Sequence, residues 1–332
     1  MEKQSIGIIG GGSWATALVK IFSEQTNLPV HWWVRNEEVA RHIENYGHNP
    51  NYLSSVQFEK KRIHVSSAIH EVIKKSTHLV FAVPAAFLQK SMAGVTNREL
   101  EDKFIICAIK GVVPEKNLIP GTFFQNEFNV SGNCIGVITG PCHAEEVALE
   151  KLSFLTIAST NTQLSAQISN WLNGRFIRTV ESTDTIGAEF AGILKNIYAV
   201  ASGIYHGLGY GDNFQAVFIT NAIREMERFL ARTGTVFHDV KQSAYLGDLL
   251  VTAYSQFSRN RTFGSMIGKG YSVKSAQIEM NMIAEGFYAC KSIYEMNRAI
   301  GADLPIVDSV YRVLYERMSP AIEMKLLSAK LS

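Results

Sequence analysis

The feature that most constrains this chain is a glycine-rich turn near its N-terminus. An apolar run over residues 6–9 is typical of a strand, three glycines follow it, and a helical pattern starts at Ala15. Gly10, Gly12 and Ala15 form the pattern G-x-G-x-x-A. We expect Gly10 to make the turn out of the strand, Gly12 to let the backbone approach a pyrophosphate, and Ala15 to let helix and strand pack closely. Because a helix N-terminus offers N–H groups to phosphate, the turn predicts a dinucleotide site.

The composition of the 332-residue chain excludes several functional classes. A net charge of +2 gives no reason to expect nucleic acid or an anionic membrane as partner. The four cysteines lie far apart and the nine histidines are scattered, so we expect no metal site and a reducing, cytoplasmic location. The residues before the first strand show no basic region followed by an apolar core, so we expect no signal peptide. No apolar run reaches the roughly 18 residues of a membrane span, so we expect no membrane insertion.

The chain divides into two parts that differ in the periodicity of their apolar residues. Short apolar runs alternate with helical patterns up to about residue 180, which predicts an α/β domain with a doubly wound, mostly parallel sheet. From residue 184 onward the periodicity is almost entirely helical. We therefore expect an N-terminal nucleotide-binding domain over residues 1–182 and an all-α domain over residues 183–332.

Informative residues follow three of the expected strands. Lys110 and Gly140 each come directly after an apolar run, and ligands of open α/β sheets bind at such strand ends. Arg35 follows the second strand, where NAD-binding proteins carry an acidic residue that binds the ribose 2′-hydroxyl. A cation there suits a 2′-phosphate and favours NADPH. The alternative is an arginine on a solvated turn, and the nearby Glu37 and Glu38 keep NADH as a second candidate.

A lysine stands in the middle of an apolar helix. The helix expected from Asp184 to about His206 is apolar nearly all round, yet it carries Lys195 and Asn196. Burial would lower the pKa of a lysine and demand a partner, which is how enzymes prepare lysine for proton transfer. Asp248, in an otherwise apolar segment, is the candidate partner.

The densest basic spot of the second half is the run Ser258-Arg259-Asn260-Arg261. Guanidinium groups bind phosphate in a bidentate fashion, and hydroxyl and amide groups complete such a shell. The plain alternative is a solvated loop. Together with the glycine-rich turn and the buried lysine, the run favours a small phosphorylated substrate.

These residues together resemble a known family, the bacterial NAD(P)H-dependent glycerol-3-phosphate dehydrogenases. The resemblance runs in order over nearly the whole chain. Its motifs are Gly10-Gly11-Gly12-Ser13-Trp14-Ala15, Val83-Pro84, Lys110-Gly111, Thr139-Gly140-Pro141, Leu194-Lys195-Asn196, Leu246-Gly247-Asp248-Leu249, Ser258-Arg259-Asn260-Arg261 and Glu285-Gly286.

The resemblance implies a Rossmann domain followed by a helical domain of the 6-phosphogluconate dehydrogenase-like type. The implied reaction is reversible reduction of dihydroxyacetone phosphate to sn-glycerol 3-phosphate, a precursor of glycerophospholipids. With Arg35 in mind, we expect NADP(H) as the preferred cofactor and NAD(H) as the second candidate, and we expect a homodimer.

The resemblance also assigns roles by position. Lys195 would be the proton donor and acceptor, held by Asp248 and Asn196. The residues implied to contact substrate are Lys110, Gly140, Cys142, Lys195, Asp248, Ser258, Arg259 and Asn260. Those implied to bind cofactor are Gly10, Gly12, Ser13, Trp14, Arg35, Lys110, Ala144, Arg259, Ile283 and Glu285. The family usually has Ser or Thr at the position of Cys142.

Two alternatives stay open. A β-hydroxyacid dehydrogenase or ketopantoate-type reductase also pairs a Rossmann domain with a helical domain that carries a lysine, but it binds carboxylates. A non-catalytic NADPH-binding sensor would bind cofactor without oxidising it and would need no buried lysine–aspartate pair.

Overall fold

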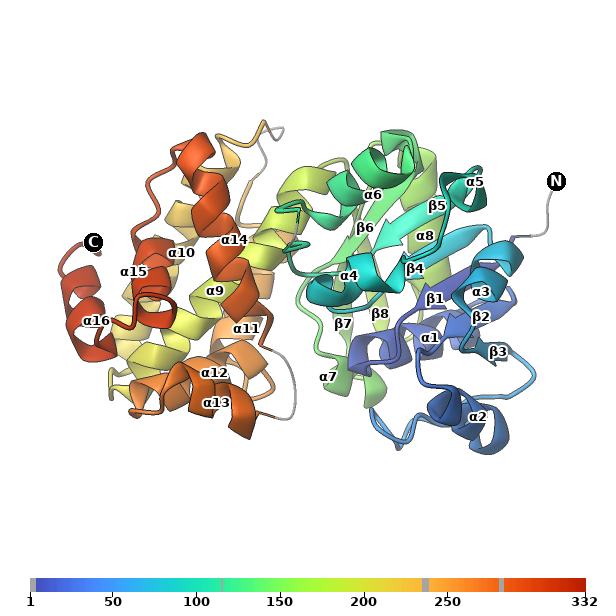
Figure 1. Ribbon diagram of the computed structural model, residues 1–332, viewed down its shortest axis with the longest axis horizontal. Helices are drawn as coiled ribbons and strands as arrows, with labels where there is room; N and C mark the ends of the chain where they lie inside the picture. Colours follow the sequence, from blue (N-terminus) through green and yellow to red (C-terminus); the bar gives the residue numbers. More distant parts are fainter. Residues whose placement is uncertain (1–3, 115, 235–238, 281–283) are drawn as a thin grey trace. The chain divides into compact units, whose positions relative to one another are not determined.

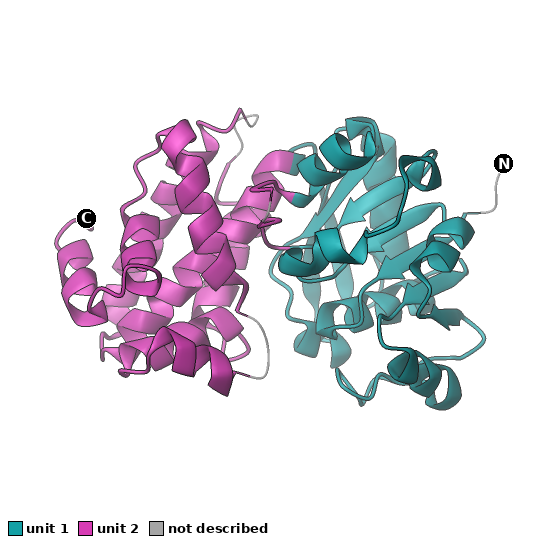
Figure 2. Ribbon diagram, viewed as in Figure 1, with its two compact units in different colours: residues 1–109, 120–185 teal, residues 110–119, 186–332 magenta. Residues whose placement is uncertain are grey.

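The computed structural model describes residues 4–114, 116–234, 239–280 and 284–332. The chain forms two compact units, drawn in separate colours in Figure 2. The first comprises Met1–Ile109 and Pro120–Thr185, and the second Lys110–Ile119 and Ile186–Ser332. The short segment Lys110–Ile119 therefore belongs to the second unit. Residues 120–185, which belong to the first unit, separate it in the sequence from the rest of the second unit.

An eight-stranded sheet forms the centre of the first unit (Figure 1). Its strand order is β3-β2-β1-β4-β5-β6-β7-β8, in which the first six strands are parallel. β7 pairs antiparallel with β6, and β8 runs parallel to β7. The strands are β1 Ile6–Ile9, β2 Val30–Trp33, β3 Ile63–Ser66, β4 His78–Phe81, β5 Phe104–Cys107, β6 Ile135–Thr139, β7 Ser153–Ala158 and β8 Ile177–Ser182. The expected doubly wound, mostly parallel sheet is confirmed.

The central strands are apolar because both of their faces are covered. Every residue of β1, β4 and β6 is buried, as is typical of strands between two helical layers. The helix α1 packs with α7 and α8, whereas α3 packs with α5. The helices are α1 Ser13–Gln25, α2 Glu37–Tyr46, α3 Ile69–Lys75, α4 Ala85–Ser91, α5 Asn97–Leu100, α6 Pro120–Phe128, α7 Ala144–Ala148 and α8 Thr162–Leu172, with a 3-10 turn η1 at Gly132–Cys134.

The second unit is built around one buried helix. In α9 every residue from Gly187 to Tyr205 is buried, which confirms the expectation of a core helix. Its neighbours are α10 Asp212–Leu230, the π-helical turn η2 Ser243–Gly247, α11 Asp248–Tyr254, α12 Arg259–Gly268, α13 Val273–Glu279, α14 Glu285–Ile300, α15 Pro305–Leu314 and α16 Pro320–Ser328, with α9 itself spanning Thr185–Gly207. Among the described residues, no helix is long and apolar enough to cross a membrane.

Glycines let α9 and α12 touch backbone to backbone. A Cβ added at Gly203 would lie 2.1 Å from the carbonyl oxygen of Arg261, and one at Gly264 would lie 2.0 Å from that of Val200. Both distances are far below van der Waals contact, so neither position accepts a side chain without movement. Each helix repeats the glycine one turn later, at Gly207 and Gly268. The close crossing brings the start of α12 to the middle of α9.

Candidate active site

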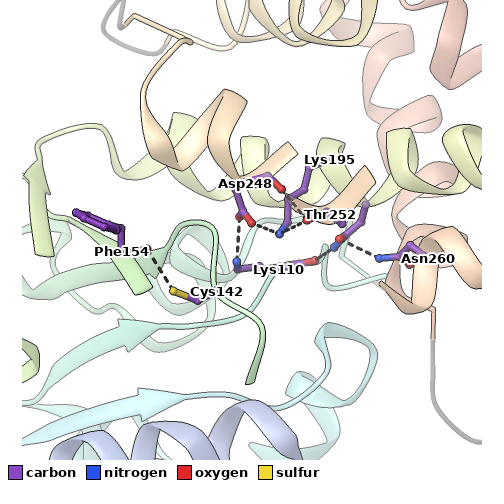
Figure 3. A network of polar contacts seen from close by, with 8 residues as sticks. Lys110, Cys142, Phe154, Lys195, Asp248, Thr252 and Asn260 are labelled. Carbon is purple, nitrogen blue, oxygen red and sulfur yellow. Dashed lines mark hydrogen bonds and ion pairs between the residues drawn. The ribbon is translucent and has the colours of Figure 1, made fainter. Parts of the chain in front are cut away.

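The middle of α9 carries a lysine that is bonded to a buried carboxylate. Lys195 Nζ donates a hydrogen bond to Asp248 Oδ1, and Lys110 Nζ donates to Asp248 Oδ2 at 2.9 Å (Figure 3). The side chain of Asp248 is 0% exposed, that of Lys195 7%, and that of Lys110 20%. One carboxylate therefore bridges two ammonium groups, of which Lys110 is the one that reaches solvent. The sequence predicted the pair of Lys195 with Asp248.

Burial and charge together set the protonation of this cluster. Burial, with a smaller contribution from the nearby ammonium of Lys110, lowers the pKa of Lys195 to about 7, although the charge of Asp248 opposes both effects. Burial also disfavours the ionised form of Asp248, but the two lysines outweigh that effect and hold its pKa below the usual value. Lys195 can therefore gain or lose a proton near neutral pH beside a carboxylate that stays charged.

Thr252 also belongs to this cluster, although it was not predicted from the sequence. Lys195 Nζ donates to Thr252 Oγ1 at 2.9 Å, and that hydroxyl donates to the backbone oxygen of Asp248 at 2.6 Å. The spacing of four residues between Asp248 and Thr252, which places both on one face of α11, was the available signal. A lysine has three N–H bonds, and two of those of Lys195 are directed at Asp248 and Thr252.

A chain of three hydrogen bonds connects α14 to Lys110. The N–H of Gly286 donates to Asn260 Oδ1, Asn260 Nδ2 donates to Asn196 Oδ1, and Asn196 Nδ2 donates to the backbone oxygen of Lys110. Each of the three distances is 2.9 Å. Asn196 and Asn260, both predicted site residues, thus fix the backbone from which the Lys110 side chain reaches Asp248.

The basic run at Ser258–Arg261 begins a helix and is not a solvated loop. Ser258 is the N-cap of α12 and its hydroxyl accepts a hydrogen bond from the N–H of Arg261 at 3.3 Å. Arg259, the first residue of α12, is exposed. A guanidinium at a helix N-terminus combines two positive features that suit a phosphate. Glu285 is the first residue of α14 and is partly buried, and the predicted cofactor residue Ile283 lies outside the described residues.

The glycine-rich turn of the first unit fits a dinucleotide phosphate. Gly10 has a φ of +144°, and a Cβ there would lie 2.6 Å from the backbone oxygen of Ala82. A Cβ at Gly12 would meet nothing within 4 Å, so space is open in front of this residue. Gly12 caps α1 without a side-chain hydrogen bond, which leaves the N–H groups at Ser13 and Trp14 for a ligand. The indole Nε1 of Trp14 is also buried without a partner among the described residues.

The remaining predicted residues of this unit follow β2 and β6. Arg35 is exposed, and its guanidinium lies 5.9 Å from the ring centroid of Phe87. Gly140 has a φ of +118°. The thiol of Cys142 donates to the backbone oxygen of Phe154 at 3.2 Å, and Ala144 begins α7 in a buried position. Because β1, β2 and β6 are all parallel members of one sheet, the residues that follow them lie at the same sheet edge.

Comparisons with known proteins agree with this combination of units. The family described as NAD-dependent glycerol-3-phosphate dehydrogenase matches twice, with its N-terminus over residues 5–165 and its C-terminus over residues 184–325. A glycerol-3-phosphate dehydrogenase (NAD(P)+) from Chlorobium phaeobacteroides is 32% identical over 312 residues, which cover 94% of this chain and 93% of that protein. The crystal structure of glycerol-3-phosphate dehydrogenase from Coxiella burnetii has a TM-score of 0.89 at 28% identity and covers 98% of both chains. A ketopantoate reductase from Ralstonia eutropha shares the fold alone, with a TM-score of 0.58 at 13% identity over 98% of this chain and 99% of that one.

Proposed function

Because the chain belongs to the NAD-dependent glycerol-3-phosphate dehydrogenase family, we propose that it reversibly reduces dihydroxyacetone phosphate to sn-glycerol 3-phosphate. The observation that carries the proposal is the buried lysine with a pKa of about 7, bonded to Asp248 and lying close to a basic helix N-terminus. The buried lysine provides a group for proton transfer to a carbonyl oxygen, and the basic helix N-terminus provides a binding site for phosphate. The product would serve glycerophospholipid synthesis.

We assign binding of the cofactor's pyrophosphate and adenosine ribose to the first unit. Gly10 and Gly12 would admit the pyrophosphate, and the N-terminal N–H groups of α1 at Ser13 and Trp14 would bind it. Arg35 stands beyond β2 as an exposed cation and would bind a ribose 2′-phosphate, so NADP(H) is the preferred cofactor and NAD(H) the second candidate. The nicotinamide supplies the hydride of the reduction. The remaining predicted cofactor contacts are Lys110, Ala144, Arg259, Ile283 and Glu285.

Lys195 is the proposed proton donor in reduction and the proton acceptor in oxidation. In its charged form, Nζ would donate to the substrate oxygen at C2 and stabilise the negative charge that develops there. In its neutral form, the same nitrogen would take the hydroxyl proton of glycerol 3-phosphate. Asp248 and Thr252 hold Nζ in place, and Asn196 fixes the backbone of Lys110. Neither Asp248 nor Asn196 needs to exchange a proton in this scheme.

The start of α12 is the proposed phosphate anchor. Arg259 would pair with the phosphate while the N-terminal N–H groups of α12 face the same anion. Binding energy from the phosphate would orient C2 for reaction, because remote contacts contribute to positioning. Lys110, whose side chain is 20% exposed, would be a second cation for the substrate. Ser258, Asn260, Gly140 and Cys142 remain predicted substrate contacts.

A substrate panel tests the proposal. NADPH absorbance is followed with dihydroxyacetone phosphate, with ketopantoate and other 2-keto acids, and with dihydroxyacetone that lacks the phosphate. We expect NADPH to be oxidised with dihydroxyacetone phosphate, and not with the keto acids or with dihydroxyacetone. Activity restricted to a keto acid would identify a ketopantoate-type reductase instead, and tight NADPH binding without oxidation by any substrate would identify a sensor. The expected homodimer and cytoplasmic location are separate proposals, which light scattering and cell fractionation would test.

A further inference from the structure

The glycine-rich turn is held in shape by three side chains from three different elements. Its three successive carbonyl groups each accept one side-chain hydrogen bond. The pairs are Trp32 Nε1 with the Gly10 oxygen at 2.6 Å, Asn49 Nδ2 with the Gly11 oxygen at 3.0 Å, and Thr16 Oγ1 with the Gly12 oxygen at 2.9 Å. Trp32 lies on β2, Asn49 lies in the loop after α2, and Thr16 lies on α1. All three side chains are 0% exposed.

Asn49 is the residue at which these contacts meet. Its Nδ2 donates both to the Gly11 oxygen and, at 2.9 Å, to Thr16 Oγ1. Its Oδ1 accepts from the N–H groups of Asn51 and Tyr52 at 3.0 and 3.2 Å. The two N–H bonds and two lone pairs of the amide are therefore all used. The amide connects the loop after α2 to the turn that the sequence singled out for pyrophosphate.

This arrangement determines which backbone groups are left for a ligand. A run of glycines has the largest conformational freedom of any chain segment, and ordering it upon binding would reduce affinity. Bonds to the interior at residues 10–12 remove that freedom before a ligand arrives. These bonds occupy the three carbonyl oxygens, whereas the N–H groups of Ser13 and Trp14 at the start of α1 have no hydrogen-bond partner among the described residues. A carbonyl facing a phosphate bound at these N–H groups would repel that anion.

We propose that Asn49 is a positioning residue for the dinucleotide pyrophosphate, which acts by fixing the Gly11 carbonyl and the Thr16 hydroxyl and thereby the shape of the turn. The inference rests on the proposed cofactor site and adds to it a residue outside the glycine motif. Asn49 itself need not touch the cofactor. Its loss should therefore weaken cofactor binding while leaving the capture of substrate unchanged.

The experiment measures the dissociation constant for NADPH by titration calorimetry on the full chain. We expect Asn49→Ala to raise it about tenfold, equivalent to about 1.4 kcal/mol, with the KM for dihydroxyacetone phosphate at saturating NADPH within twofold of wild type. Asn161→Ala is the matched control. The Asn161 side chain also accepts two N–H bonds at a helix start and donates to a backbone oxygen, but it lies at α8. The Asn161→Ala substitution should lower the thermal stability of the protein and leave its NADPH affinity unchanged.

A second pair of variants keeps the test valid if Asn49→Ala does not fold. Thr16→Val removes the hydroxyl with little change of shape, whereas Thr16→Ser keeps it. We expect Thr16→Val to weaken NADPH binding about threefold or more and Thr16→Ser to restore it. The inference is overturned if Asn49→Ala binds NADPH within twofold of wild type, or if Thr16→Ser is as weak as Thr16→Val. A wild-type protein that binds neither NADPH nor NADH would instead overturn the proposed function.

Discussion

Lys195 and Asp248 form an ion pair in the interior of the helical unit, where the carboxylate has no exposed surface. The second oxygen of Asp248 lies 2.9 Å from Nζ of Lys110, so that one negative charge faces two positive ones. Burial and the second lysine bring the pKa of Lys195 to about 7. A fully paired lysine would stay charged at any physiological pH. The shared carboxylate thus allows a lysine to work as both acid and base.

Replacing Asp248 by Asn should shift the pH dependence of the reduction and slow it. Without the carboxylate, two ammonium groups would face each other, and the pKa of Lys195 would fall further. The pH at which kcat/KM for reduction is half-maximal should move downward, and activity at pH 7 should fall about 100-fold, within the range of general-acid effects. The measurement is the pH profile of kcat/KM.

Asp303→Asn is the control for this variant. Asp303 pairs with Arg228 at 3.7 Å on the surface, and its side chain is 80% exposed. We expect its removal to leave the pH profile in place. A profile for Asp248→Asn that coincides with that of wild type would contradict the role given to the carboxylate.

The two directions of the reaction should respond oppositely to pH. Reduction needs the charged form of Lys195 and should decline as pH rises through about 7, whereas oxidation needs the neutral form and should increase over the same interval. Initial rates in both directions between pH 5.5 and pH 9 check this, with the range chosen as about two units around the pKa. The residual activity of the Lys195→Ala variant should show neither the decline of reduction nor the increase of oxidation across this pH range. Parallel profiles in the two directions would exclude Lys195 as the titrating group.

Arg35→Ala should separate the two cofactors. The loss of a charged hydrogen bond to a 2′-phosphate, about 1.5–3 kcal/mol, should weaken NADPH binding roughly tenfold or more. NADH has no such group, and its dissociation constant should stay unchanged. Arg41→Ala, which removes an exposed arginine of α2 paired with Glu37 at 3.7 Å, is the control. Equal weakening of NADPH and NADH would mean that Arg35 does not read the 2′-phosphate.

Gly203→Ala should destabilise the helical unit. The new Cβ would lie 2.1 Å from the Arg261 carbonyl oxygen, so α9 and α12 must separate. We expect a loss of about 1–3 kcal/mol in the free energy of unfolding, the usual range for overpacking, and a raised KM for dihydroxyacetone phosphate because α12 carries Arg259. Denaturant unfolding measures the first effect. In Gly211→Ala the new Cβ meets nothing within 4 Å. Because Gly211 is the N-cap of α10, where alanine is a poorer cap than glycine, this control should lose at most about 1 kcal/mol and keep its KM. Equal behaviour of the two variants would contradict the close crossing.

The sequence predicted the features that depend on local pattern. Buried strands such as Ile135–Thr139 show as short apolar runs, and the core helix around Lys195 shows as apolar residues on every side. The partner Asp248 was predictable because a charge in an apolar segment needs compensation. These inferences require only a few neighbouring residues.

The contacts between distant segments were not predictable in this way. Lys110 and Asp248 are 138 residues apart, and no local pattern indicates that the segment after β5 joins the helical unit. Asn49 gave no signal either, because an Asn-Pro pair in a polar loop is typical of a plain turn. Only the fold places its amide beside the Gly11 carbonyl. Polar networks of this kind depend on tertiary geometry, which single-sequence patterns do not contain.

Lys195 is proposed to transfer the proton without taking part in the binding of NADPH. The most direct test compares NADPH oxidation by dihydroxyacetone phosphate in wild type and Lys195→Ala, with NADPH affinity measured on the same preparations. We predict a loss of turnover of about 10²–10⁴-fold with the NADPH dissociation constant nearly unchanged. Turnover that survives the substitution, or turnover and NADPH binding that disappear together with the fold, would contradict the account.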